Sequence, residues 1–156
     1  MVLELDDRGA IVTCPTCAQR NRIAFKRWGD RVRCAICKNE LPVPAEPLEI
    51  RSTGDFDRLI SQASVPVLVD YWAVWCGPCR MVAPEVARVA AGTAGKVIVV
   101  KVDTDALSDL GERFNVRSIP TLALFVGGRE VGRVMGARPA ADIEAFIERS
   151  TASVRQ

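Results

Sequence analysis

The sequence predicts an α/β protein with a mixed β-sheet flanked by helices, preceded by a small cysteine-rich module. Two observations predict this arrangement. In the larger part of the chain, apolar runs typical of buried strands alternate with segments whose apolar residues recur at helical spacing. In the smaller part, four of the six cysteines lie within the first 40 of the 156 residues, and a proline-rich stretch, 42–47, follows them. So small a segment cannot bury a sufficient hydrophobic core by itself, so it requires an additional stabilising link such as a metal ion or a disulfide.

The first half of the larger part predicts a short helix, a buried strand and a longer helix. The short helix spans 54–62, with Asp55 expected as its N-cap because a side-chain oxygen there can accept a free backbone N–H. The nearly continuous apolar run 66–72 predicts a central strand that is covered on both faces. The longer helix spans 78–91, where apolar residues recur at helical spacing before a glycine-containing stop.

The second half of the larger part predicts three strands and two helices. A buried strand is expected at 97–104 and a short helix at 106–114. Strands at 121–126 and 129–136 are separated by a Gly-Gly dipeptide, which is typical of a hairpin. A helix over 141–150 closes the series. With a further strand ahead of the short helix, the order is β-α-β-α-β-α-β-β-α, which indicates an α/β sandwich with a mixed sheet.

Composition restricts the chemistry and the location of the protein. The chain has no histidine, which excludes imidazole metal ligands and Ser-His or Cys-His catalysis. All six cysteines lie in three C-x-x-C pairs, which in a reducing compartment favour metal binding or redox chemistry over structural disulfides. The longest apolar run, 97–100, is too short to cross a bilayer, and the N-terminus lacks the apolar region of a signal peptide. We therefore expect a cytoplasmic protein that does not bind a membrane.

The third cysteine pair, Cys76 and Cys79, lies between the predicted central strand and the longer helix. A helix N-terminus offers free N–H groups and a partial positive charge, which stabilise a thiolate at Cys76. Cys79 lies one turn inside the helix, and Pro78 occupies a position where the helix needs no N–H. A lone C-x-x-C pair also suits a metal ion, but this context predicts a redox centre.

Asp70 stands among valines in the middle of the predicted central strand. Burial disfavours the charged form of a carboxylate, so the pKa of Asp70 is expected to rise. One interpretation is a structural carboxylate whose hydrogen bonds are satisfied. The other is a group that exchanges a proton with Cys79, in a chain that has no histidine to do so.

The first two pairs, Cys14/Cys17 and Cys34/Cys37, are separated by sixteen residues, which matches the spacing of zinc sites built from four cysteines. We expect these four thiolates to hold one structural Zn²⁺, with the intervening segment forming a hairpin turned at 28–30. Metal binding would supply the folding free energy that so small a module lacks. The competing interpretation is an additional redox pair or a regulatory disulfide. Zinc-bound thiolates could also sense oxidants by releasing the metal.

The charge of the module argues against a nucleic-acid partner. Residues 1–45 carry eight Lys and Arg against five Asp and Glu. Four thiolates around Zn²⁺ contribute a charge of about −2, so the module keeps a net charge of roughly +1. A net charge this small is typical of a solvent-exposed ribbon, and it is too small to indicate binding to the phosphate backbone of a nucleic acid.

Three segments of the larger part resemble the thioredoxin family, over residues 49–150 in all. They are VLVDYWAVWCGPCRMVAP (67–84), VRSIPTLALFVGG (116–128) and VMGA (134–137). The resemblance implies a thioredoxin fold and protein-disulfide reductase activity. A thioredoxin domain preceded by a four-cysteine module is similar to the bacterial thioredoxins that carry an N-terminal zinc finger. We therefore expect a zinc-ribbon module at 1–41, a proline-rich linker at 42–48 and a thioredoxin domain at 49–156.

The resemblance also implies a role for each matching residue. Cys76 would attack a substrate disulfide, and Cys79 would resolve the mixed disulfide that results. Asp70 would exchange a proton with Cys79, and Lys101 would pair with Asp70. A cis peptide bond before Pro120 would place the preceding backbone beside Cys76, where an extended substrate could bind. The substrate-binding surface implied by the resemblance consists of Trp75, Gly77, Pro78, Ile119, Pro120, Gly136 and Ala137.

The resemblance finally implies partners. A flavin-dependent thioredoxin reductase would recharge the cysteine pair with electrons from NADPH, and disulfide-containing client proteins would receive them. The chain itself is expected to bind no organic cofactor, because it has no G-x-G-x-x-G fingerprint. A monomer is expected.

Overall fold

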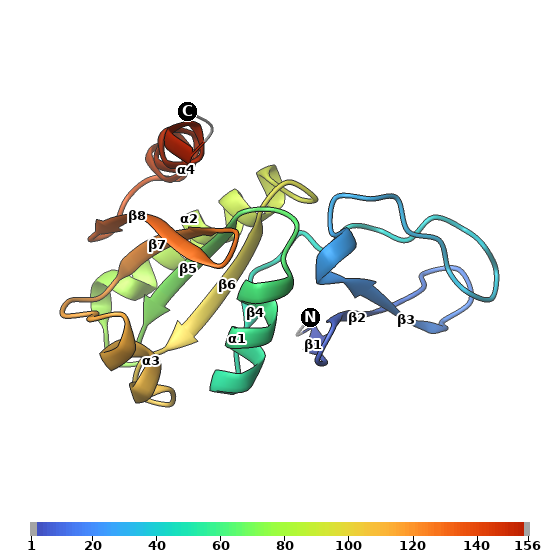
Figure 1. Cartoon of the computed structure of the whole chain (residues 1–156), viewed down its shortest axis with the longest axis horizontal. Helices are drawn as coiled ribbons and strands as arrows, with labels where there is room; N and C mark the ends of the chain where they lie inside the picture. Colours follow the sequence, from blue (N-terminus) through green and yellow to red (C-terminus); the bar gives the residue numbers. More distant parts are fainter. Residues whose placement is uncertain (1–2, 155–156) are drawn as a thin grey trace.

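A mixed five-stranded sheet forms the centre of the larger part of the molecule (Figure 1). The computed structural model describes residues 3–154. The strands, in their order across the sheet, are β4 (Leu48–Glu49), β6 (Ile98–Asp103), β5 (Val67–Trp72), β7 (Thr121–Val126) and β8 (Arg129–Met135). Strands β4, β6 and β5 are parallel, whereas β7 and β8 are antiparallel to their neighbours. The predicted α/β class with a mixed sheet is confirmed.

Helices cover both faces of this sheet. On one face lie α2 (Gly77–Gly92) and α4 (Ala140–Val154), and on the other lie α1 (Thr53–Gln62) and α3 (Ser108–Arg113). Successive residues of a strand point to opposite faces. Leu68 of β5 therefore packs under α2, whereas Val69 and Tyr71 pack with the core on the α1 face. Both cores are buried, which explains the nearly continuous apolar run of β5.

The start of α1 differs from the prediction. Asp55 is not the N-cap, because Ser52 holds that position and its Oγ accepts the backbone N–H of Asp55 at 3.0 Å. Asp55 lies in the first turn, where its carboxylate accepts a hydrogen bond from Arg58 at 2.8 Å. An acidic residue there also stabilises the helix N-terminus. The predicted turn between β7 and β8 is confirmed, since Gly127 and Gly128 have φ angles of 60° and 81°.

The smaller part, which we call the ribbon, is an antiparallel three-stranded sheet. Its strands are β1 (Glu4–Leu5), β2 (Gly9–Thr13) and β3 (Arg20–Ala24), followed by the 3₁₀ helix η1 (Phe25–Arg27). The predicted hairpin turned at 28–30 is wrong, because β3 pairs with β2 and not with the segment after Trp28. Trp28 is only 2% exposed and stacks on Phe25, with ring centroids 6.2 Å apart. Trp28 is thus a buried residue within a turn, in which the backbone N–H of Asp30 donates to the carbonyl of Arg27 at 3.0 Å.

The ribbon packs beside α1, at the edge of the large sheet formed by β4 (Figure 1). One hydrophobic cluster contains Phe25 and Trp28 of the ribbon together with Leu48 and Leu59 of the larger part. The backbone N–H of Ser64 donates to the carbonyl of Phe25 at 3.1 Å, which fastens the end of α1 to the ribbon. The two parts thus share a core. No helix among residues 3–154 is both long and apolar enough to span a membrane.

Candidate redox centre and candidate metal site

Cys76 and Cys79 lie where β5 leads into α2, as the sequence predicts. Cys76 is the N-cap of α2, and its Sγ accepts the backbone N–H of Cys79 at 3.2 Å. The two cysteines form a disulfide, and both are buried. A hydrogen bond from a free N–H at a helix N-terminus favours negative charge on Cys76 Sγ. The local structure therefore supplies the features that a reactive thiolate needs.

The loop before Pro120 lies against the cysteine pair. The Ile119–Pro120 peptide bond is cis, and the carbonyl oxygen of Ile119 lies 3.7 Å from Cys76 Sγ. The backbone N–H of Gly136 donates to the carbonyl of Pro120 at 2.9 Å, and Gly136 has a φ of 91°, which favours glycine. Segments far apart in the sequence thus meet at Cys76.

An exposed apolar surface surrounds this junction. Trp75 is 68% exposed, and its indole N–H donates to the carboxylate of Asp105 at 2.9 Å. Gly77, Pro78, Gly136 and Ala137 are exposed, as the predicted surface requires, whereas Ile119 is partly buried and Pro120 is buried. The prediction omitted three further exposed apolar residues of the same segments, namely Val74, Met81 and Met135. The sequence could have indicated these three residues, because each is an apolar side chain that lies either next to a predicted site residue or on the polar face of a predicted helix.

Asp70 is 1% exposed and lies on the α2 face of β5. One of its carboxylate oxygens, Oδ1, has no hydrogen-bond partner within the described part of the chain. Burial raises the pKa of Asp70 to about 6, the charge of Lys101 lowers it, and the charge of Glu49 raises it further. Asp70 is thus not the fully satisfied structural carboxylate of the first interpretation. A pKa close to neutral suits a group that exchanges protons.

Lys101 lies beside Asp70 in the register of β6 and β5, but the two do not form a direct ion pair among the described residues. Its Nζ lies 4.5 Å from the centroid of the Trp72 ring, a cation–π contact that holds the ammonium group over the indole. Lys101 therefore acts on Asp70 through space, without the salt bridge that the resemblance implies. Glu49, which occupies the matching position on β4, was not predicted as part of the site.

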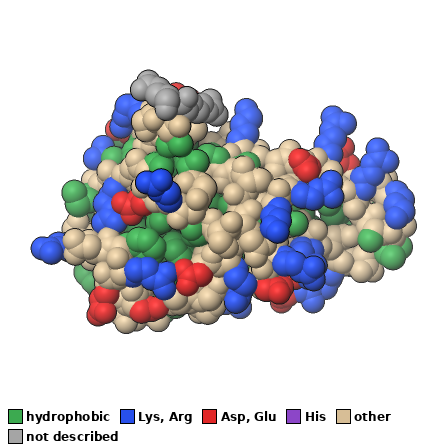
Figure 2. All heavy atoms as spheres, in the orientation of Figure 1, with side chains coloured by type: hydrophobic (Ala, Val, Ile, Leu, Met, Phe, Trp, Pro, Cys, Tyr) green, Lys and Arg blue, Asp and Glu red, His purple; other side chains and the backbone are tan. Residues whose placement is uncertain are grey.

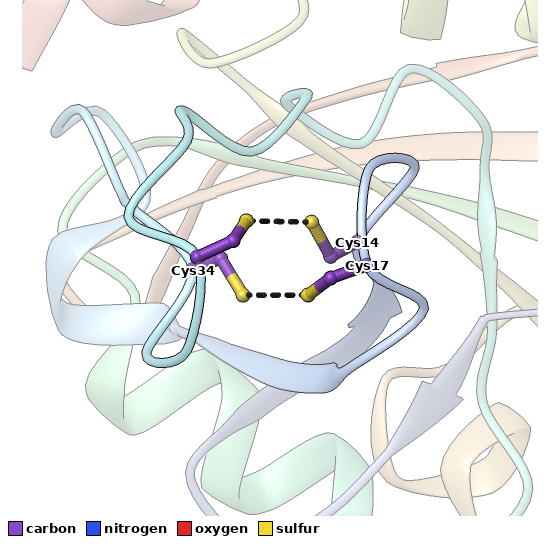
Figure 3. A group of neighbouring side chains, drawn as sticks. Cys14, Cys17 and Cys34 are labelled. Carbon is purple, nitrogen blue, oxygen red and sulfur yellow. Dashed lines mark hydrogen bonds between the residues drawn. The ribbon is translucent and has the colours of Figure 1, made fainter.

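The four cysteines of the ribbon converge on one point (Figure 3). All four Sγ atoms lie within 4.8 Å of one another, with 3.6 Å between Cys14 and Cys37 and 3.5 Å between Cys17 and Cys34. Four thiolates at about 2.3 Å from one tetrahedral ion would lie roughly 3.8 Å apart, so the donor set fits a metal ion such as Zn²⁺. The structure thus brings together the four cysteines that the spacing predicts.

Two equivalent loops present these sulfurs, one at each C-x-x-C pair. In each loop the N–H of the first cysteine donates to the carbonyl five residues on, at 2.8 Å. The residue after the second cysteine donates back to the carbonyl of the first, and it has a left-handed backbone with φ of 65° at Ala18 and 67° at Lys38. Because the hydrogen-bond pattern repeats, the two loops form a pair of matched knuckles around the candidate metal site.

Asn21 supports the sulfur of Cys34. Its Nδ2 lies 3.4 Å from Cys34 Sγ, and its Oδ1 accepts the backbone N–H of Ala35 at 3.0 Å. Hydrogen bonds from the backbone of Cys37, from Asn21 and from Ile36 lower the pKa of Cys34 to about 6. They favour the thiolate that a metal ion requires, as outer-shell groups of metal sites do. Sequence reasoning missed Asn21, because nothing local distinguishes it from other strand residues.

The charge of the ribbon is mixed. On the face shown in Figure 2, Lys and Arg side chains lie scattered over the ribbon with Asp and Glu among them. Arg20 pairs with Glu4, and Arg22 pairs with Asp6 at 2.5 Å, so part of the basic charge is neutralised locally.

Comparison with known proteins agrees with the geometry of the site. The family model described as Thioredoxin matches residues 47–149. Thioredoxin C-3 of Corynebacterium nephridii is 38% identical over 138 residues, which are 88% of this chain and 93% of the relative, so the match extends into the ribbon. Thioredoxin 1 of Nostoc sp. is 47% identical over 94 residues, covering 60% of this chain and 88% of the relative. A mutant thioredoxin from Halobacterium salinarum superposes with a TM-score of 0.64 at 34% identity, covering 70% of this chain and 95% of that structure.

The four-cysteine cluster in front of the matched segment is consistent with thioredoxin 2, the bacterial type that carries an N-terminal zinc finger. Cys76 and Cys79, which form a disulfide, lie within the matched segment. The chain belongs to the thioredoxin family, and it is a protein-disulfide reductase of that family.

Proposed function

We propose that the chain reduces disulfides of other proteins through a dithiol–disulfide cycle of Cys76 and Cys79. The Cys76 thiolate attacks one sulfur of the substrate disulfide, and the other substrate sulfur leaves as a thiolate. Cys79 then attacks Cys76 Sγ, which closes the Cys76–Cys79 disulfide and releases the second substrate sulfur. The substrate gains two electrons and the cysteine pair loses them.

One observation carries this proposal: Cys76 caps α2 with its Sγ beside the Ile119 carbonyl, while Cys79 lies buried one turn further on. Asp70 is the acceptor that we assign to the proton of Cys79, because its pKa of about 6 leaves it mostly ionised near neutral pH. Lys101 supports the ionised form of Asp70 through its charge. The backbone of Ile119, which is only partly buried, can pair with an extended substrate segment.

The substrate-binding surface is apolar and shallow, which suits unfolded or extended client segments. We assign it to the predicted set of Trp75, Gly77, Pro78, Ile119, Pro120, Gly136 and Ala137, and we add Met81 and Met135 because both are largely exposed. Methionine side chains adapt to different partners, so they suit a surface that accepts many clients.

We further propose that an NADPH-dependent thioredoxin reductase restores the dithiol after each cycle. Family membership supports this partner, and the chain is then a cytoplasmic electron carrier that holds no organic cofactor of its own. We expect it to act as a monomer, divided into the zinc-ribbon module, linker and thioredoxin domain at 1–41, 42–48 and 49–156.

The Cys76→Ser variant tests the cycle. In an insulin-reduction assay with dithiothreitol as electron donor, we expect it to lose the catalysed rate, because serine cannot form the mixed disulfide. Cys79→Ser should instead accumulate a covalent complex with a disulfide-containing client, visible by non-reducing electrophoresis. Unchanged insulin reduction by Cys76→Ser would contradict the proposal.

We propose Zn²⁺ as the ion of the ribbon site, held by Cys14, Cys17, Cys34 and Cys37. An all-sulfur donor set favours Zn²⁺ over harder cations, and the bound ion would supply folding free energy to the ribbon. Metal analysis of protein purified without oxygen should find about one zinc ion per chain, as one tetrahedral site of four thiolates requires. Zinc that survives in a Cys14→Ala/Cys17→Ala variant would refute this assignment.

A second role for the same site is oxidant sensing, which the exposure of Cys17 favours. Peroxide would oxidise two zinc-bound thiolates to a disulfide, take up two protons and become two molecules of water, and the ion would be released. Zinc release can be followed with a chromogenic chelator during mild peroxide treatment. Full retention of zinc after the Cys76/Cys79 pair has been oxidised would exclude the sensing role.

A further inference from the structure

Three charged residues lie side by side across three neighbouring strands of the large sheet. Glu49 of β4 is the register partner of Lys101 on β6, and Lys101 is the register partner of Asp70 on β5. Register partners of parallel strands point to the same face, and for Asp70 that is the face covered by α2. The row Glu49–Lys101–Asp70 therefore runs from the edge of the sheet to a position under the redox helix.

The middle residue of this row contacts neither carboxylate directly. The ammonium group of Lys101 lies over the Trp72 ring, and no ion pair joins it to Glu49 or Asp70 within the described chain. Asp70 is almost fully buried, and its Oδ1 lacks a hydrogen-bond partner in the region the structure describes. Charges that are neither paired nor hydrated interact over longer distances than surface charges do. Asp70 is therefore sensitive to both of the other members of the row.

Glu49 has an environment of its own. Burial raises the pKa of Glu49, Lys101 lowers it, Asp103 raises it, and Arg51 lowers it. Glu49 also lines a cavity of about 220 Å³, together with Arg51, Asp55 of α1 and residues Leu3, Glu4 and Leu5 of the ribbon. Asp55 is paired with Arg58, and Glu4 is paired with Arg20. The outer end of the row is thus half-buried and borders space that the ribbon helps to enclose.

We propose that Glu49 is a positioning residue of the redox centre, whose carboxylate competes with Asp70 for the charge of Lys101 and so sets the pH at which Asp70 takes a proton. The proposal rests on the proposed function only in giving Asp70 a proton-transfer role towards Cys79. Strand β1 forms one wall beside Glu49, so the ribbon takes part in setting the environment of this residue.

The Glu49→Gln variant tests this coupling, because it removes the negative charge and keeps the shape. Glu49 and Asp70 are two strands apart, roughly 10 Å between backbones, so we expect the titration midpoint of Asp70 to fall by roughly 0.3 to 1 pH unit. The midpoint is measured from the ¹³C shift of the Asp70 carboxyl carbon in the reduced, metal-loaded protein. Glu49→Asp, which keeps the charge, should retain most of the wild-type midpoint.

Glu148→Gln is the matched control, since it removes one acidic charge from an exposed position on α4. It should leave the Asp70 midpoint unchanged. An unchanged midpoint in Glu49→Gln, or an equal fall in Glu148→Gln, would overturn the proposal.

The pH profile of insulin reduction gives a second readout. In Glu49→Gln its acidic limb should move to lower pH by the same amount as the Asp70 midpoint. A limb that stays in place while the midpoint falls would show that Glu49 does not act on the reaction. Because the carboxyl titration needs no activity, failure of insulin reduction in the wild type would count against the proposed function and leave the coupling to be decided by the titration.

Discussion

A carboxylate in the middle of a strand of apolar residues is unfavourable for folding, and Asp70 occupies such a position. Its folded-state pKa of about 6 lies above the ordinary value of 3.8. The folded protein therefore binds the proton more tightly than the unfolded chain. The stability that this binding contributes is fully present below about pH 4 and is lost as the pH rises through about 6.

Asp70→Asn should stabilise the protein and impair its activity. A pKa difference of this size corresponds to about 3 kcal/mol, the upper limit of the gain in free energy of unfolding at pH 8. At pH 4 the gain should disappear, and reduction of insulin near neutral pH should be slower because Cys79 lacks its proton acceptor. Urea unfolding at both pH values measures this, with Glu148→Gln as the control that should show no such pH dependence.

At the scale of elements, the two knuckles of the ribbon are close copies of each other. In each, a residue with a side chain occupies the left-handed region directly after the second cysteine, Ala18 in one and Lys38 in the other. For residues other than glycine this conformation costs about 1 to 2 kcal/mol. The hydrogen bonds of the knuckle and the bound metal ion would have to offset this cost.

Ala18→Gly should therefore strengthen metal binding. Glycine removes the strain of the left-handed backbone but makes the unfolded chain more flexible, which costs free energy. The net gain in folding free energy is about 0.5 to 1 kcal/mol, which corresponds to roughly a two- to fivefold gain in metal affinity. Chelator competition measures it. Thr16→Gly changes the same knuckle at a residue without a positive φ, so it should weaken binding, and a gain of equal size there would contradict the explanation.

At the scale of the whole molecule, the ribbon and the large sheet share one hydrophobic cluster. Trp28 lies at the junction between the two parts. The next residue, Gly29, packs close to the larger part, since a Cβ added to it would lie 3.4 Å from the carbonyl oxygen of Gly95. A shared core makes unfolding of the two parts cooperative. Chelation of the metal should consequently lower the single melting temperature of the whole chain.

Trp28→Ala should separate the two parts. Truncation of a buried tryptophan costs about 3 to 5 kcal/mol, and here the loss falls on the junction. We expect calorimetry to show two transitions, of which only the lower one responds to metal removal, whereas Trp28→Phe should keep a single transition. Two separate transitions in the wild-type protein would show that the shared core does not couple the parts.

The sequence predicted most elements of the fold because their signals are local. Apolar periodicity, the Gly-Gly turn and the position of Cys76 between a strand and a helix each depend on a few neighbouring residues. The cap of α1 was misplaced because Ser52 and Asp55 are both good capping residues, and only the backbone decides between them. The hairpin expected around 28–30 is wrong, although a turn lies there, because β3 pairs with β2, and the burial of Trp28 depends on a surface that lies far away in the chain.

By itself, the sequence determined which chemistry the protein carries. All three pairs share the C-x-x-C spacing, but the sixteen residues between the first two pairs and the strand and helix that flank the third are also encoded locally, and they separate the redox pair from the pairs of the candidate metal site. Only the tertiary structure decided how these sites are supported. The charge row from Glu49 to Asp70, the amide of Asn21 beside Cys34 and the core shared with the ribbon all join residues far apart in the chain. Strand register and packing create such contacts, and neither leaves a trace in the spacing of nearby residues.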